Sequence, residues 1–270
     1  MRVSEVGRGI QVQTLVYRLL LAREGGYAAR EVEVFGEGRL DRFDRPGEGK
    51  HPTCMHFDNV TVNDRFQLAH YGKPNNRVST RIAGSTVKLS GYLVPITTDA
   101  KGEVRIEKTM RFQDDRYDVD VKLRFEGTGP IAYVGAWWDV NDKWTRAMRS
   151  GAGVFMPLRV GIGDSFGDNL CRAWRSMKAM ADAAGVWMEF IGTKASILVA
   201  LKSPSPGKMR AGGMKFWDGP DDAIEGEGVS HGCINLDVIN CELARIKPLR
   251  LREFAFSYRV FLSGPTMLRE

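Results

Sequence analysis

Apolar and polar residues alternate along much of this chain, which is typical of strands with one buried face. The clearest example is Tyr117–Phe125, where every second residue is apolar and the residues between are Asp, Lys or Arg. The same period of two recurs over Arg30–Phe35 and over Phe254–Leu262 near the C-terminus. Shorter apolar runs between turn residues predict further strands. These lie at Val87–Val94, Val104–Phe112, Ile131–Trp138, Val186–Phe190 and Ser196–Leu201.

Only one segment has a convincing helical period. In Asn169–Ala184 the apolar residues recur at three- and four-residue spacing, and Gly185 is a suitable stop. Gln11–Ala22 fits a helix or a strand equally well. Many short strands and one main helix predict an all-β fold, a large antiparallel β-sandwich. No linker divides the sequence, so we expect a single domain over residues 1–270.

Composition supports a globular chain that stays in the cytoplasm. Hydrophobic residues make up 43% of the sequence, enough for a substantial core. The longest purely apolar run near the start is Leu19–Ala22, too short for a membrane span or the core of a signal peptide. We therefore expect no membrane association.

Net charge and cysteine content limit the classes of ligand and cofactor that we expect. The net charge is +6, but basic residues are interleaved with Asp and Glu throughout, so nucleic acid is an unlikely partner and anionic ligands are mildly favoured. The four cysteines show no CxxC pair and no zinc-ligand spacing. We expect free thiols, no bound metal and no cofactor.

A first candidate site is the segment Val160–Gly167, an apolar run that ends in Gly-Asp-Ser. It resembles the nucleophile block of SGNH hydrolases, which need an Asp-x-x-His near the C-terminus to activate the serine. No histidine follows His231, and Gly228 stands three residues before it. We therefore interpret this segment as a turn that precedes a helix.

A second candidate centres on Cys233. Ser230–Asn235 (Ser-His-Gly-Cys-Ile-Asn) resembles the cysteine block of L,D-transpeptidases, a resemblance that implies a thiolate nucleophile and an upstream histidine base. The segment Lys215–Gly219, where that base is expected, contains no histidine. A cysteine-nucleophile acyl transferase is thus the alternative function, and the other interpretation of Cys233 is a small buried residue.

A third candidate uses nearly the whole chain, whose order of features resembles the galactose mutarotase-like (aldose 1-epimerase) superfamily. The matching segments are an Arg-bearing loop, a His-x-Gly segment, an apolar-x-Gly strand end, a central alternating strand and a C-terminal block with a carboxylate. They lie at Gly36–Arg39, His70–Gly72, Leu89–Gly91, Tyr117–Phe125 and Cys233–Asp237. The resemblance implies a β-supersandwich that acts on or binds sugars.

The resemblance also implies a catalytic pair. Ring opening of a pyranose needs a carboxylate to take the anomeric proton and an acid to protonate the ring oxygen. Asp237 stands where the family has its general base, one methylene shorter than the usual Glu. His70, from the His-x-Gly segment, is the histidine that the resemblance pairs with it. The segment 135–141, which should carry the acid histidine, contains tryptophans instead.

The remaining expected ligand residues are Arg39, Asp139 and the pair Trp137 and Trp138. A guanidinium suits a sugar hydroxyl or carboxylate, and an aromatic ring suits a sugar face. Adjacent strand residues point to opposite sides, so only one of the two tryptophans should line a cleft. We therefore expect a carbohydrate-binding protein, or a divergent enzyme of the epimerase or polysaccharide lyase type, whose partner is a sugar or sugar acid. No pattern indicates an oligomeric state.

Overall fold

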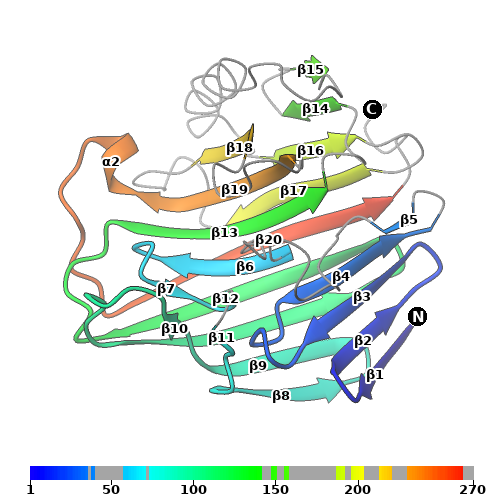
Figure 1. The fold of residues 1–270 in the computed structure, drawn as a ribbon, viewed down its shortest axis with the longest axis horizontal. Helices are drawn as coiled ribbons and strands as arrows, with labels where there is room; N and C mark the ends of the chain where they lie inside the picture. The colour runs from blue at the N-terminus through cyan, green and yellow to red at the C-terminus, as the bar shows by residue number, and fades with distance from the viewer. Residues whose placement is uncertain are drawn as a thin grey trace.

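The computed structural model describes residues 1–35, 38–39, 57–70, 73–141, 147–150, 155–157, 187–191, 196–203, 213–220 and 230–263. Within this part of the chain two antiparallel sheets pack face to face, as Figure 1 shows. The predicted antiparallel β-sandwich is therefore confirmed. The predicted helix Asn169–Ala184 and the Gly-Asp-Ser segment lie outside the described residues.

The first sheet has eleven strands within the described part of the chain. Its main path, in spatial order, is β1 (Arg2–Val6), β2 (Gly9–Gln13), β3 (Tyr17–Ala22), β4 (Ala29–Val34), β6 (Phe57–Val62), β13 (Tyr133–Asn141), β19 (Ser230–Asn240) and β18 (Gly213–Pro220). Three short strands pair beside this path: β5 (Gly38–Arg39), β7 (Phe66–Gln67) and β10 (Val94–Pro95).

The second sheet has nine described strands. In spatial order they are β15 (Phe155–Pro157), β14 (Ala147–Ser150), β16 (Trp187–Ile191), β17 (Ser196–Ser203), β20 (Glu253–Ser263), β12 (Arg116–Glu126), β11 (Glu103–Phe112), β9 (Thr86–Tyr92) and β8 (Val78–Ala83). One short helix, α2 (Cys241–Ala244), follows β19 directly. No helix among the described residues is long and apolar enough to cross a membrane.

The alternating pattern forms strands because it lets each strand bury one face. Along β12, buried residues occupy every second position from Tyr117 to Phe125, and the charged residues between them are more exposed. The ambiguous run Gln11–Ala22 forms part of a hairpin of β2 and β3. The Thr14 hydroxyl oxygen accepts hydrogen bonds from the backbone N–H groups of Val16 and Tyr17 at 3.0 and 2.9 Å, which closes that turn.

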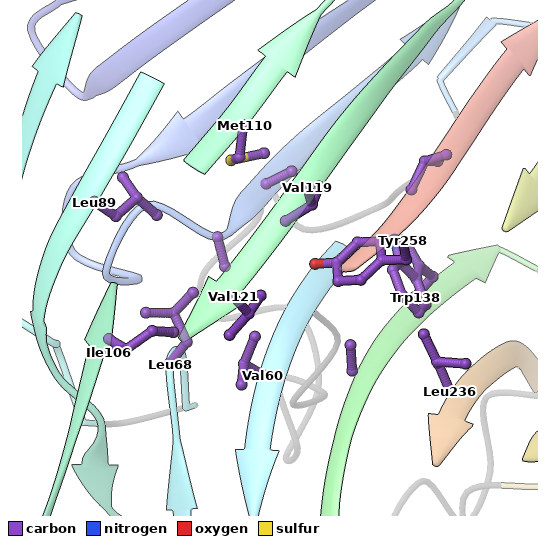
Figure 2. Close-up of a cluster of buried hydrophobic side chains, with 14 of the residues drawn as sticks. Val60, Leu68, Leu89, Ile106, Met110, Val119, Val121, Trp138, Leu236 and Tyr258 are labelled. Atoms are coloured by element: carbon purple, nitrogen blue, oxygen red, sulfur yellow. The ribbon is translucent and has the colours of Figure 1, made fainter. Parts of the chain in front are cut away.

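The hydrophobic core lies between the two sheets. Figure 2 shows side chains from both sheets meeting there, among them Val60 and Leu68 from one and Ile106 and Val121 from the other. Residues with essentially no exposed surface make up most of this layer. The outward faces of the two sheets are thus left for polar chemistry.

Candidate functional site

Strand β13 has two chemically different faces. Val134, Ala136 and Trp138 are fully buried members of the core between the sheets. Tyr133, Gly135 and Trp137 alternate with them and therefore lie on the opposite side of the strand. We call the side of the first sheet that points away from the second sheet the outer face.

Asp237 lies on this outer face, although it is only 1% exposed. Its neighbours Leu236 and Val238 point into the core, and its backbone is opposite Gly135 of β13. One carboxylate oxygen, Oδ1, accepts a hydrogen bond from the Tyr133 hydroxyl at 2.8 Å. The other, Oδ2, accepts one from the Asn240 side-chain amide at 2.9 Å. Each carboxylate oxygen therefore accepts a hydrogen bond from a described side chain.

Tyr133 links Asp237 to Trp137. The Trp137 indole N–H donates to the Tyr133 hydroxyl oxygen at 3.0 Å, and that hydroxyl donates onward to Asp237. Burial and then the charge of Asp237 raise the pKa of Tyr133 well above its ordinary value of 10.0, although the Trp137 bond acts in the opposite direction. Tyr133 therefore stays protonated at physiological pH and remains a donor.

Gly135 makes this arrangement possible. A Cβ atom at position 135 would lie 2.5 Å from the Tyr133 hydroxyl oxygen and 2.9 Å from the ring carbon that carries it. The Tyr133 side chain therefore lies along the strand over the bare Cα of Gly135, which brings its hydroxyl to Asp237. Sequence reasoning missed Tyr133, although its position in phase with Gly135 and Trp137 was an available signal.

The polar row continues across the sheet from Asp237. Thr61 of β6 is paired with Gly135, and Gln67 of β7 is paired with Thr61, so their side chains share the outer face. Thr61 is fully buried and Gln67 is 4% exposed. Within the described residues, no hydrogen-bond partner reaches Thr61 Oγ1 or Gln67 Oε1. An unmet buried polar atom costs about 1–3 kcal/mol, so these two oxygens are suited to a donor from a ligand or from water.

His70 lies beyond this row, just after β7, and is half-buried. The Asn59 side chain holds the preceding residue, Ala69, through two 3.0 Å hydrogen bonds to its backbone. β6 and β13 separate β7 from the Asp237 strand. A ligand that touched both His70 and Asp237 would therefore have to lie across two strands, so the acid/base pair stays a prediction.

The other predicted ligand residues lie in different parts of the fold. Trp138 is fully buried in the core, where its ring meets Tyr258 edge-on at 4.9 Å between centroids, as Figure 2 shows. That position removes Trp138 from the candidate ligand residues and leaves half-buried Trp137. Arg39 lies on β5, paired with Glu33 of β4, and Asp139 lies on β13. The side chains of Arg39 and Asp139 are outside the described part of the structure.

Cys233 lies in the middle of β19, where its backbone is paired with β13 on one side and β18 on the other. The side chains of Cys233 and His231 are not among those described, so the thiol nucleophile stays a hypothesis. No group of three His, Cys, Asp or Glu side chains within the described residues could hold a metal ion. The outer face therefore offers fixed hydrogen-bonding groups beside an aromatic ring.

No model of a known protein family matches this sequence, and no curated protein matches it. Solved structures do match. Galactose 1-epimerase from Lactobacillus acidophilus NCFM aligns with a TM-score of 0.53 and 9% identity over 94% of each chain. A galactose mutarotase-like protein from Lactobacillus casei ATCC 334 aligns with a TM-score of 0.51 and 10% identity over 93% of this chain and 99% of that one.

A larger protein contains the same fold. The 4-alpha-glucanotransferase from Thermococcus litoralis aligns with a TM-score of 0.51 and 11% identity over 96% of this chain, which spans only 39% of that enzyme. Identities this low establish the fold and not the activity. The chain is therefore similar, along nearly its whole length, to proteins with the galactose mutarotase-like fold.

Proposed function

We propose that this protein binds a carbohydrate, a sugar or sugar acid, on the outer face of its first sheet. The observation that carries the proposal is the row formed by Asp237, Tyr133, Thr61 and Gln67 across three neighbouring strands and β7. Four polar side chains share a face beside Trp137, and two of them have oxygen atoms without a described donor. Sugars supply many hydroxyl donors and an apolar ring face, which suits such a surface.

Two further observations support the proposal: the similar solved structures and the position of the row in the fold. Solved structures with this fold include a galactose 1-epimerase and a 4-alpha-glucanotransferase, and the names of both refer to sugars. The position of the row on β13 and β19 also coincides with the segments that the sequence resemblance nominated for the sugar site. Fold alone does not assign activity, so the proposal rests on the residues of the row.

Binding, rather than turnover, is the function we infer. A general base must reach the proton that it removes. Both Asp237 oxygens already accept hydrogen bonds, from Tyr133 and Asn240, so in this arrangement Asp237 positions its neighbours. Trp137 is the half-buried group that a ligand can reach directly.

The test is calorimetric titration of the protein with a panel of hexoses, hexuronic acids and short oligosaccharides. We expect at least one class to bind and Trp137→Ala to weaken that binding about fivefold, corresponding to about 1 kcal/mol for one aromatic contact. Tyr92→Ala is the matched control, because Tyr92 is a half-buried aromatic on the second sheet. No binding by any sugar class, or equal losses in both variants, would contradict the proposal.

Turnover is checked separately by polarimetry of anomerically pure sugars. We expect no protein-dependent mutarotation. If mutarotation occurs and Asp237→Asn abolishes it while binding persists, the protein is an epimerase-type enzyme and Asp237 is its base.

A further inference from the structure

A second polar cluster lies between the two sheets, away from the outer face. It begins with a β-bulge in β6, where Asn59 pairs with Trp137 but Phe57 pairs with Trp138, so Asp58 is the extra residue. Asp58 has a φ of 66°, the left-handed region that few residues other than glycine adopt. The bulge places a fully buried carboxylate in the apolar layer. Such backbone strain persists only where the surroundings enforce it.

Lys108 of β11 faces this carboxylate from the other sheet. It is fully buried, because it is in phase with the core residues Ile106 and Met110. Its Nζ lies 2.9 Å from Asp58 Oδ1 and 2.9 Å from the Asp58 backbone oxygen. The Tyr258 hydroxyl, from β20, donates to the same Oδ1. Asp58 Oδ2 has no hydrogen-bond partner within the described residues.

The surroundings of this pair are buried and aromatic. Tyr258 meets the Trp138 ring edge-on, and Tyr117 is another fully buried aromatic residue close enough for the Asp58 charge to affect it. Figure 2 shows Tyr258 and Trp138 together between the sheets. Within an apolar layer two opposite charges lose their hydration, and their mutual attraction often fails to offset that loss.

We propose that Lys108 and Asp58 condense into an intramolecular amide bond, which joins the two sheets covalently. The amine nitrogen and the carboxyl group are already in contact, are shielded from water and are held by strands of different sheets. The product carries no charge, so it removes the cost of burying two ions.

Protonation favours the reactive forms. Burial lowers the pKa of Lys108 from its ordinary 10.5, although the Asp58 charge opposes this effect. Burial raises the pKa of Asp58 from its ordinary 3.8, although Lys108 and the Tyr258 hydrogen bond act to lower it. A neutral amine is the nucleophile and a neutral carboxyl group is the electrophile that condensation requires.

The step balances without a co-reactant. The Lys108 ammonium first gives one proton to Asp58 Oδ1, the carboxylate oxygen 2.9 Å away, which leaves an amine and a carboxylic acid. The amine nitrogen attacks Cγ, and negative charge develops on Oδ2. The nitrogen then gives a second proton to Oδ1, the Cγ–Oδ1 bond breaks while the Tyr258 hydroxyl donates to the leaving oxygen, and one water molecule leaves. The Nζ–Cγ bond remains, and nothing is oxidised or reduced.

Mass spectrometry of the full chain under denaturing conditions tests the proposal. We expect the intact mass to fall short of the sequence mass by one water molecule. Trypsin should release a branched product that joins residues 51–65 to residues 106–111, with no cleavage after Lys108. An intact mass equal to the sequence mass, separate peptides cleaved after Lys108, or a water loss located elsewhere would each overturn it.

Two variants make the assignment specific. Lys108→Arg keeps a cation but offers no nucleophilic amine, so its mass should equal its own sequence mass. Asp58→Asn can form the same amide with loss of ammonia, so its linked product should have the same mass as the linked wild-type protein. A branched peptide that persists in Lys108→Arg would overturn the proposal. The wild-type measurement decides the question even if a variant does not fold.

Discussion

Two buried carboxylates, Asp237 and Asp58, lie on opposite sides of the first sheet and are held by different chemistry. Asp237 is on the outer face, where the hydroxyl of Tyr133 and the amide of Asn240 hold its oxygens. Asp58 is between the sheets, where Lys108 Nζ lies 2.9 Å from its Oδ1 and the Tyr258 hydroxyl donates to the same oxygen.

Because their partners differ, substitutions at the two sites should differ in their effect on stability. At Asp237, hydrogen bonds from a hydroxyl and an amide fix the carboxylate in orientation on the outer face. A lysine that faces an aspartate in a buried apolar layer is costly to keep as an ion pair, and as the proposed amide it joins the two sheets. The comparison predicts that single substitutions in the core pair lower the free energy of unfolding more than those on the outer face.

The largest effect is expected for Lys108→Met. Lys108→Met removes the proposed link between the sheets and leaves Asp58 as an uncompensated buried carboxyl group, so the free energy of unfolding should fall by at least about 3–5 kcal/mol. Urea unfolding followed by fluorescence measures it. Lys122→Met is the control, because Lys122 forms an exposed ion pair with Glu253 at 3.2 Å and should cost less than about 1 kcal/mol.

The double variant Asp58→Asn/Lys108→Met sharpens this prediction. Asparagine tolerates the left-handed backbone of position 58 and carries no charge, so the double variant should be more stable than Lys108→Met alone. A double variant that is less stable than the single one would show that the charge of Asp58 is not the cause.

On the outer face, Gly135→Ala should have a smaller effect. The new methyl group displaces the Tyr133 hydroxyl and so breaks its bond to Asp237, at a cost of about 2–3 kcal/mol in unfolding free energy. Gly7→Ala is the control, since a Cβ there meets nothing within 4 Å. Equal melting temperatures for the two variants would mean that the Tyr133 side chain does not lie over Gly135.

Tyr133→Phe removes the same hydrogen bonds without a clash. Asp237 Oδ1 and the Trp137 N–H each lose a partner, so we expect a loss of about 1–2 kcal/mol in thermal or urea unfolding. Tyr92→Phe, on the second sheet, should change stability by less than about 0.5 kcal/mol. A larger loss for Tyr133→Phe than for Gly135→Ala would contradict the order proposed here.

The smallest effect is expected at Asp118, on the outward face of the second sheet. Burial acts to raise its pKa, but hydrogen bonds from Arg259 and Lys202 outweigh burial and lower the pKa from 3.8. The stabilisation is therefore present above pH 3.8 and is lost as pH falls through the lowered pKa. Asp118→Asn should cost about 1 kcal/mol at pH 7, and urea unfolding should show that difference shrinking below about pH 4.

Sequence alone predicted the sandwich, because alternation directly reports which side of a strand is buried. β12 (Arg116–Glu126) differs by one residue at each end from the predicted Tyr117–Phe125. The opposite orientations of Leu236 and Asp237 follow from the same rule. Gln11–Ala22 stayed ambiguous because its apolar residues fit the period of a helix or of a strand, and nothing around Thr14, which closes the turn, marks the break.

The two polar clusters were less accessible to sequence reasoning. Lys108 occupies an apolar phase in its strand, a local signal that a buried cation is present, but its partner is 50 residues away. The bulge at Asp58 depends on how β6 pairs with β13, and no local sequence pattern predicts it. Likewise, the neighbours of Asp237 on β13 and β6 come from distant parts of the chain, so only the register brings Tyr133 and Thr61 to it.

The position of β20 in the second sheet has a consequence for biosynthesis. β20 lies between β12 and β17, so the described second sheet stays in two halves until β20 is available (Figure 1). The 60 residues from 204 to 263 follow β17, and at ordinary translation rates they take roughly 3–12 s to make. During that interval β12 and β17 each have an open edge that another nascent chain could pair with. We therefore expect chains truncated before Glu253 to aggregate.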